Sequence, residues 1–174
     1  MSPFPIQSVN AFSSEEFLAT FGPVFEKSAW VATAAWPRRP FRGPRHLHET
    51  MVAAAAEAGE EAQLALLRAH PDLAGRLAAQ GALTAESTRE QAGSGLLGLD
   101  AATLAEFNAL NACYTAKFEF PFIICARLNS VDTILAAFHE RLEHDRAEEW
   151  AAALREIGKI AELRLRDLVE DNGQ

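Results

Sequence analysis

Three stretches of the sequence combine polar side chains in ways that could support chemistry, and the first is His70-Pro71-Asp72-Leu73. A residue that precedes proline is pushed out of the α region, so His70 is expected at the end of a helix with a restricted backbone. Such a backbone can hold the imidazole in one orientation. An imidazole with a pKa of about 6.5 can act as a general base at neutral pH. The alternative for His70 is a capping or surface role.

The second stretch, residues 87–91, reads Ser-Thr-Arg-Glu-Gln. Ser87, Glu90 and Gln91 are spaced i, i+3 and i+4, so their side chains share one face if this stretch is helical. A hydroxyl, a carboxylate and an amide on one face suit a ligand rich in N–H and C=O groups. The same spacing is also common on solvent-exposed helices, which is the alternative interpretation.

The third feature is Arg164, a charged residue among apolar ones in the last predicted helix. Apolar residues recur there at helical spacing, which predicts an inward face: Trp150, Leu154, Ile157, Ala161 and Leu168. Arg164 falls on that face. Burying an unpaired charge is very costly, so this guanidinium must pair with a core carboxylate, extend to solvent, or contact a ligand. In the last case it would bind an anionic or carbonyl-rich molecule.

Several sequence patterns that resemble dinucleotide-binding or metal-binding motifs lack the structural context that such sites require. Residues 93–98 match GxGxxG, but a dinucleotide site needs a preceding strand, and here a polar helical segment precedes the glycines, so we expect a helix-terminating loop. His139 and His144 are five apart, not the four that place two metal ligands on one helix face, and no HExxH occurs. His46 and His48 face different ways on a helix. We therefore expect no metal site.

The elements that position these residues follow from a helical hydrophobic period covering nearly the whole chain. Ser13 and Glu16 predict a capping box that opens the first helix, and Gly22-Pro23 ends it. Asp100 is the expected N-cap of a long helix that reaches about Lys117. The remaining helices are predicted at about 25–36, 46–58, 60–69, 72–79, 84–92, 131–144 and 147–170.

One run of β-type residues, 118–125, interrupts the helices. Pro121 in its middle disfavours a central strand and no partner strand is evident, so we expect a buried extended crossing between helices. The sequence therefore predicts an all-α fold, with residues 1–174 forming a single domain of seven to nine helices. A chain of 174 residues buries enough apolar surface to fold without a disulfide or a metal.

Composition argues against several other classes. The formal net charge is −8 and the basic residues are scattered among acidic ones, which disfavours nucleic-acid binding. No apolar run approaches the length of about 18 residues that spans a membrane.

The first residues show no basic region followed by an apolar one, so no signal peptide is expected and the cytoplasm is the default location. Cys113 and Cys125 form no CxxC, so both are expected to be buried thiols in a reducing compartment.

Six segments follow one another along the chain in a specific order: residues 21–26 (FGPVFE), Trp30 with Trp36, residues 67–74 (LRAHPDLA), Ser87-x-x-Glu90-Gln91, Asn111-x-x-Tyr114-x-x-Lys117-Phe118-x-Phe120-Pro121-Phe122-Ile123, and Ile157-x-Lys159-Ile160-x-x-Leu163-Arg164-Leu165. With this order and these gaps, the chain resembles the 2-oxo-4-hydroxy-4-carboxy-5-ureidoimidazoline (OHCU) decarboxylases from about Phe17 to Val169.

The resemblance implies an all-helical enzyme that uses no cofactor and converts OHCU to (S)-allantoin in urate breakdown. Its catalytic residues would be His70 and Glu90. The substrate pocket would be lined by Pro71, Ser87, Thr88, Arg89, Gln91, Arg164 and the main chain of Phe122, Ile123, Ile124, Cys125 and Ala126. The partner would be a small ureidoimidazoline, without nucleic acid or membrane, and a homodimer stays an open option. Three residues depart from the family pattern: Glu119 for glycine, His144 for asparagine and Ser94 for alanine.

In the implied reaction, the carbon that loses CO₂ also carries a hydroxyl and lies next to a C=N bond. The electron pair left behind flows into that imine, so no metal, pyridoxal or thiamine is required. His70 would hydrogen-bond to or deprotonate the hydroxyl, and Glu90 would accept from substrate N–H groups and orient His70. Arg164 and backbone amides would hold carbonyl oxygens. Two alternatives stay open: a helical interaction module without turnover, and an enzyme that acts on another ureide.

Overall fold

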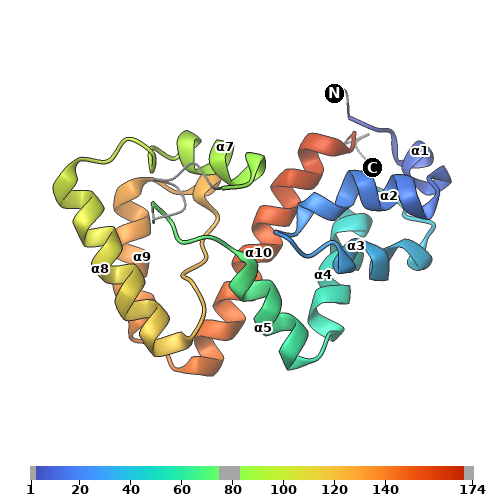
Figure 1. Ribbon diagram of the computed structural model, residues 1–174. Coiled ribbons are helices and arrows are strands. Elements are labelled where there is room, and N and C mark those ends of the chain that lie inside the picture. The colour runs from blue at the N-terminus through green and yellow to red at the C-terminus, as the bar shows by residue number, and fades with distance from the viewer. Residues whose placement is uncertain (1–2, 75–82, 171–174) are drawn as a thin grey trace. The chain divides into compact units, whose positions relative to one another are not determined.

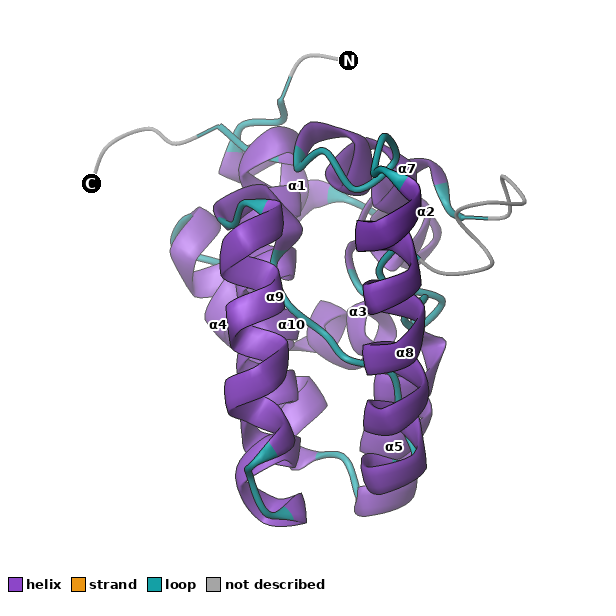
Figure 2. Cartoon of the chain, turned by 90° about the vertical axis from the view of Figure 1, so that its left-hand side faces the viewer, coloured by secondary structure: helices purple, strands orange, loops and turns teal. Residues whose placement is uncertain are grey.

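The computed structural model describes residues 3–74 and 83–170 (Figure 1). Across these residues the chain forms nine α-helices and three short 3-10 helices, and its β structure is limited to an isolated parallel bridge between Phe4 and Val169. Figure 2 accordingly draws the described chain as helices and loops. The predicted all-α class and number of helices are confirmed. The short helix expected to end near Ala79 and Gly81 lies outside the described residues.

The chain divides into two compact units. The first comprises Met1–Ala69 and Gly158–Gln174, and the second comprises His70–Ile157. The last helix, α10 (Arg146–Leu168), contributes its first part to the second unit and its remainder to the first. The single domain expected for residues 1–174 stays a prediction.

The first unit is built from α1 (Ile6–Ala11), α2 (Ser14–Phe21), α3 (Trp30–Ala35), α4 (Pro44–Glu57), α5 (Glu60–Ala69) and the 3-10 turns Gly22–Val24 and Trp36–Arg38. The predicted capping box is confirmed: Ser13 accepts from the Glu16 amide at 3.2 Å, and the Glu16 carboxylate accepts from the Ser13 amide at 2.8 Å. Helix α1 was not predicted, because its six residues have no side-chain cap to announce them. Helix α3 begins later than expected, since Lys27 has a left-handed backbone with φ 46°.

The second unit contains α7 (Ala85–Gly93), α8 (Ala101–Phe118), the 3-10 turn Ala126–Leu128, α9 (Val131–Leu142) and the first part of α10. The predicted N-cap of α8 is confirmed, because the Asp100 carboxylate accepts from the amides of Ala102 and Thr103 at 2.9 and 3.0 Å. The Thr103 contacts hold the pKa of Asp100 below its ordinary value. Thr84 caps α7 in the same way, with its side chain accepting from the Ser87 amide.

An extended segment leads from the end of α8 back toward the start of α9 (Figure 1). Its phenylalanines are buried: Phe122 stacks on Phe138 of α9 with ring centroids 3.7 Å apart, and the Phe120 ring lies edge-on to Tyr114 of α8. No ladder of hydrogen bonds forms along it within the described chain, which confirms the expected buried extended crossing. This segment therefore runs between helices with its side chains packed and part of its backbone available to other partners.

Burial corrects two details of the sequence analysis. Cys125 is buried as expected, but Cys113 is exposed, because it lies off the face of α8 that buries Phe107 and Tyr114. The predicted inward face of α10 is confirmed at residues 157, 161 and 164, whereas residues 150, 154 and 168 are only half-buried. In the described part of the chain, every helix is too short or too polar to cross a membrane.

Candidate functional site

The second unit joins two of the stretches that the sequence singled out. The Gln91 side chain of α7 is 2% exposed, and its Oε1 accepts a hydrogen bond from the Ala74 amide at 3.0 Å. From α8, the Asn111 Nδ2 donates to the Leu73 carbonyl at 3.0 Å. His70, at the start of this loop, is 9% exposed. The loop that follows His70 is therefore fixed by side chains from two helices.

Helix α7 presents its polar residues on two different sides. Ser87 and Gln91 are buried and Glu90 is half-buried, which agrees with the shared face predicted from their spacing. Thr88 and Arg89 are exposed. Their side chains bond to their own helix: the Thr88 hydroxyl donates to the Thr84 carbonyl, and Arg89 pairs with Glu86 at 3.2 Å. A role in substrate binding for Thr88 and Arg89 stays a prediction.

The extended segment brings a third stretch to α7. The 3-10 turn Ala126–Leu128, which ends this segment, packs against α7. Burial raises the pKa of the Cys125 thiol, and the carboxylates of Glu156 and Glu90 raise it further. The contact between this turn and α7 places the helix that carries Glu90 beside the end of the extended segment.

Two residues of the extended segment, Ile123 and Cys125, already have hydrogen-bond partners for their backbone groups. The Cys125 amide donates to Glu156 Oε2 of α10 at 2.9 Å, and the Cys125 carbonyl accepts from the Asn129 side chain at 3.0 Å. The Ile123 carbonyl accepts from Arg141 Nη1 of α9 at 2.7 Å. These backbone groups, which the resemblance implied as part of the pocket lining, are engaged by the protein itself.

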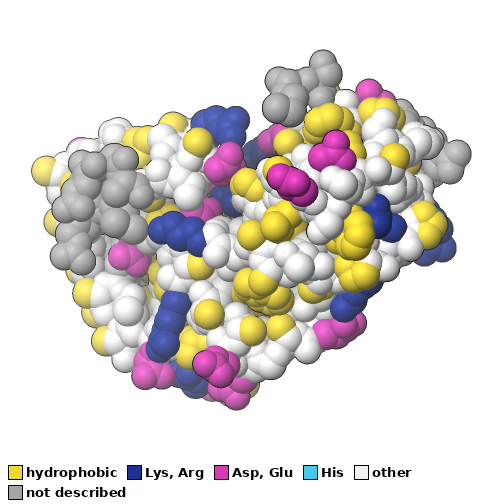
Figure 3. All heavy atoms as spheres, turned by 45° about the vertical axis from the view of Figure 1, so that its right-hand side comes forward, with side chains coloured by type: hydrophobic (Ala, Val, Ile, Leu, Met, Phe, Trp, Pro, Cys, Tyr) yellow, Lys and Arg dark blue, Asp and Glu magenta, His cyan; other side chains and the backbone are white. Residues whose placement is uncertain are grey.

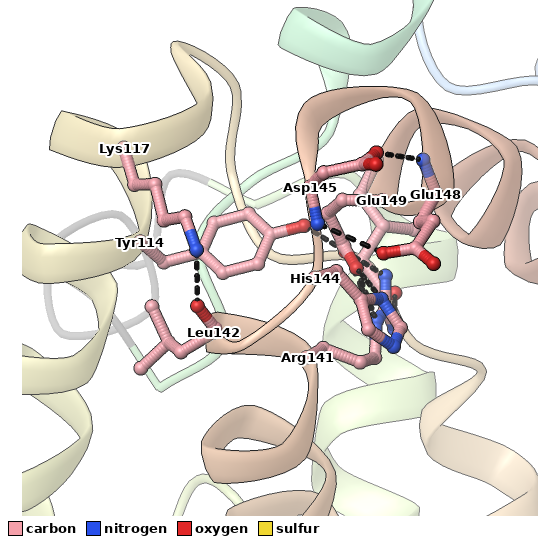
Figure 4. Close-up of polar contacts among 9 residues, drawn as sticks. Tyr114, Lys117, Arg141, Leu142, His144, Asp145, Glu148 and Glu149 are labelled. Atoms are coloured by element: carbon pink, nitrogen blue, oxygen red, sulfur yellow. Dashed lines mark hydrogen bonds and ion pairs between the residues drawn. The ribbon is translucent and has the colours of Figure 1, made fainter.

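A buried polar cluster connects side chains of α8, α9 and the first part of α10 (Figure 4). Glu149 of α10 is fully buried, and Arg141 donates to it from Nε at 3.0 and 3.2 Å and from Nη2. The Tyr114 hydroxyl donates to the same carboxylate, and the His144 Nδ1 lies 2.8 Å from it. Burial, followed by the Glu149 carboxylate, raises the pKa of the Tyr114 phenol, so the hydroxyl stays a donor. None of these four residues was among the predicted site residues.

The signal for the cluster was nevertheless present in the sequence. Arg141 follows Ile134 and Phe138 on the buried face of α9, so a charged residue stands where the helical period calls for an apolar one. The same signal identified Arg164. His144 is explained by its contact with Glu149, and Glu119 by its exposed side chain, which pairs with Arg146 at 2.7 Å.

Arg164 lies in the first unit and has a carboxylate partner there. Its Nη1 and Nη2 lie 3.3 Å from Oε2 of Glu26, and Nη1 also donates to the carbonyls of Pro23 and Val24. The side chains of Arg164 and Glu26 are 6% and 2% exposed. This is the ion-pair option that the sequence left open. Binding of a ligand by Arg164 stays a prediction.

Residues 93–98 form the loop expected of them. Helix α7 ends at Gly93, and Gly95 has φ +81°, a conformation that glycine adopts without strain. Among the described residues, no group of three or more His, Cys, Asp and Glu side chains is arranged to hold a metal ion.

Comparison with known proteins gives consistent matches. The family model for OHCU decarboxylase matches residues 10–166. The 2-oxo-4-hydroxy-4-carboxy-5-ureidoimidazoline decarboxylase of Amia calva is 44% identical over 168 residues, covering 95% of this chain and 94% of that protein. The protein of the same name from Halalkalicoccus jeotgali is 39% identical over 168 residues, covering 97% and 93%. A crystal structure of (S)-allantoin synthase superposes with a TM-score of 0.76 at 28% identity, covering 95% of this chain and 54% of that one.

Proposed function

The chain belongs to the OHCU decarboxylase family, and on that premise we propose that it decarboxylates 2-oxo-4-hydroxy-4-carboxy-5-ureidoimidazoline to (S)-allantoin in urate catabolism. One observation supports this assignment at the level of the site. The Gln91–Ala74 hydrogen bond joins the loop that follows His70 to the helix that carries Glu90. The two residues that the family resemblance implies as catalytic thus come from segments held together by a buried contact.

The proposed reaction needs a base, an electron sink and a proton. His70 hydrogen-bonds to the hydroxyl on the carbon that carries the carboxylate and accepts its proton. The carbon–carboxylate bond breaks, CO₂ leaves, and the electron pair flows into the adjacent C=N bond. The two ring carbons are then joined by a double bond, and the former imine nitrogen takes up a proton from solvent. A second proton, equivalent to the one that His70 removed, is added to the carbon bearing the ureido group, and the former hydroxyl carbon becomes a carbonyl carbon. Because the substrate's own imine receives the electrons, the proposed chemistry calls for no metal or organic cofactor.

The other residues would hold the substrate in one orientation. Glu90 is half-buried and its carboxylate only accepts hydrogen bonds, which suits the N–H groups of a ureide. Gln91 uses its carbonyl for Ala74, which leaves its N–H₂ group as the donor for a substrate carbonyl. Ser87, buried on the same face, adds a hydroxyl. Delivery of the proton from one side of such a pocket would give a single enantiomer.

The proposed partner is a small molecule rather than a polymer. On the face shown in Figure 3, basic and acidic side chains are interspersed, and the formal net charge is −8. Phosphate recognition depends on clustered basic residues, so neither feature favours a nucleic acid. The proposal includes a cytoplasmic location and leaves a homodimer open.

Allantoin, the proposed product, offers a direct binding test. A ligand that binds only the folded state raises the midpoint of thermal unfolding, and at a hundred times its Kd it adds about 2.7 kcal/mol. We expect a midpoint that rises with allantoin concentration, in the wild type and in His70→Asn alike. A rise without any turnover would favour the interaction module instead. If neither a rise nor turnover were observed, the assignment as an OHCU decarboxylase would be wrong.

A further inference from the structure

Two carboxylates of α10 are connected to the extended segment of the second unit. Glu149 and Glu156 are seven residues apart, which places them on one side of the helix, two turns apart. Glu156 accepts directly from the Cys125 amide at 2.9 Å. Glu149 acts through Arg141, with which it pairs (Figure 4). The Arg141 Nη1 donates to the Ile123 carbonyl at 2.7 Å. Both carboxylates therefore hold the backbone of residues 122–126.

The two residues held in this way, Ile123 and Cys125, are separated by a single residue in an extended chain. We call Arg141 and Glu156 their anchors. In such a chain the backbone groups of residues i and i+2 point to one side, and those of the residue between them point to the other. Ile123 and Cys125 face the anchors, so the N–H and C=O of Ile124 are directed to the opposite edge. Ile124 is 8% exposed, and its backbone groups make no hydrogen bond within the described parts of the chain.

A buried amide and carbonyl without partners are unfavourable unless something binds them. One N–H beside one C=O is also the complement of a ureide, which presents C=O and N–H groups side by side. The Ile124 backbone is therefore suited to a ureide ligand, provided that its orientation is fixed. The anchors supply this fixation, because a hydrogen bond to a carboxylate or from a guanidinium is stronger than one between neutral groups.

We propose that Glu156 and the Arg141–Glu149 ion pair are positioning residues, which orient the 122–126 backbone so that the Ile124 N–H and C=O bind the ureide part of the substrate. This inference rests on the proposed function. The residues act through the backbone and do not touch the reacting atoms. Their loss should weaken substrate binding more than it slows the chemical step.

The test compares Glu156→Ala, Glu156→Gln and a matched control, Glu140→Ala, on the exposed side of α9. Glu156→Ala removes the acceptor for the Cys125 amide and should raise KM by roughly tenfold, the effect of one lost hydrogen bond, with kcat changed much less. Glu156→Gln keeps an acceptor oxygen and should restore most of the affinity. Glu140→Ala should behave as the wild type.

Arg141→Lys tests the second anchor. It replaces the planar set of guanidinium donors by a single ammonium, so it should also raise KM.

A second readout follows the anchored backbone itself. Amide hydrogen exchange at Cys125 should accelerate in Glu156→Ala and stay slow in Glu156→Gln and Glu140→Ala. If Glu156→Ala does not fold, Glu156→Asp, which withdraws the acceptor by one methylene, should give the same rise in KM. Faster exchange at Cys125 with an unchanged KM would overturn the positioning role. Inactive wild-type protein would instead overturn the proposed function, so the two failures are distinguishable.

Discussion

The side-chain carbonyl of Gln91 accepts a hydrogen bond from the backbone amide of Ala74 at 3.0 Å, in a position where Gln91 is only 2% exposed. A buried bond of this kind fixes the loop after His70 to helix α7, one residue from Glu90. Two motifs that lie about twenty residues apart in the sequence are thereby held next to each other.

Replacing His70 by asparagine should abolish enzymatic turnover while leaving the fold intact. General base catalysis contributes about 10²- to 10⁴-fold to a rate, and asparagine cannot accept the proton. Steady-state kinetics, together with a denaturant melt to confirm folding, measure this. A variant that keeps nearly the wild-type rate would reduce His70 to a structural cap.

Replacing Glu90 by glutamine should cause a severe but incomplete loss. The amide oxygen still accepts a hydrogen bond, but the charge that orients an imidazole and binds N–H groups is gone. We expect a fall in kcat/KM of about 10²-fold, comparable to removal of one preorganised polar group from an active site. An unchanged kcat/KM would place Glu90 on the helix surface without a catalytic role.

Replacing Arg164 by methionine should destabilise the protein. The substitution keeps the volume of the apolar stem but removes the guanidinium, which leaves Glu26, 2% exposed, without its cationic partner. Stranding a buried carboxylate in this way costs about 3–5 kcal/mol of unfolding free energy. Denaturant unfolding measures the loss, and Arg164→Lys should recover only part of it, because a compact ammonium cannot reach Glu26 and two carbonyls at once.

The double variant Arg164→Met with Glu26→Leu is the matched control. Removing both charges leaves no stranded carboxylate, so much of the lost stability should return. If Arg164→Met instead keeps its stability and loses kcat/KM by a factor of about 30 to 10³ (about 2–4 kcal/mol), Arg164 binds substrate rather than Glu26.

The protein should lose stability at alkaline pH. Burial is the largest cause that raises the pKa of both Cys125 and Tyr114, whose ordinary values are 9.0 and 10.0. The folded state therefore keeps these protons at a pH where the unfolded state has released them. The free energy of unfolding should be unaffected by these groups below about pH 9 and fall as the pH rises further.

Chemical denaturation between about pH 7 and 10.5 measures this slope. Cys125→Ala should have a shallower decline than the wild type, whereas Cys113→Ser should match it, because Cys113 is exposed. An identical decline in the wild type and in Cys125→Ala would show that the buried thiol does not contribute.

Helix ends were the most predictable part of the fold, because they have local causes. The capping box of Ser13 and Glu16 and the N-cap Asp100 need only residues within three positions, and both occur as predicted. Helix α1 lacks such a signal and was missed. Cys113 was placed in the core on residue type alone, whereas its position on α8 leaves it exposed.

The site was predictable where side chains share one helix face and less so where distant segments meet. The face of Ser87, Glu90 and Gln91 follows from spacing alone. The pairing of Arg164 with Glu26 spans 138 residues, so the sequence could state that a partner was needed without naming it. Arg141 breaks the apolar pattern of α9 as Arg164 breaks that of α10, but its partner Glu149 lies on another helix and has no local signal of its own.

The central claim is tested most directly by generating the substrate in place. Urate, urate oxidase and hydroxyisourate hydrolase produce OHCU, and circular dichroism follows the product when this protein is added. We predict that the protein accelerates the appearance of a single enantiomer, (S)-allantoin, and that His70→Asn gives the rate seen without any added protein. A product that forms no faster with the protein than without it, or that forms as a racemate, would contradict the assignment.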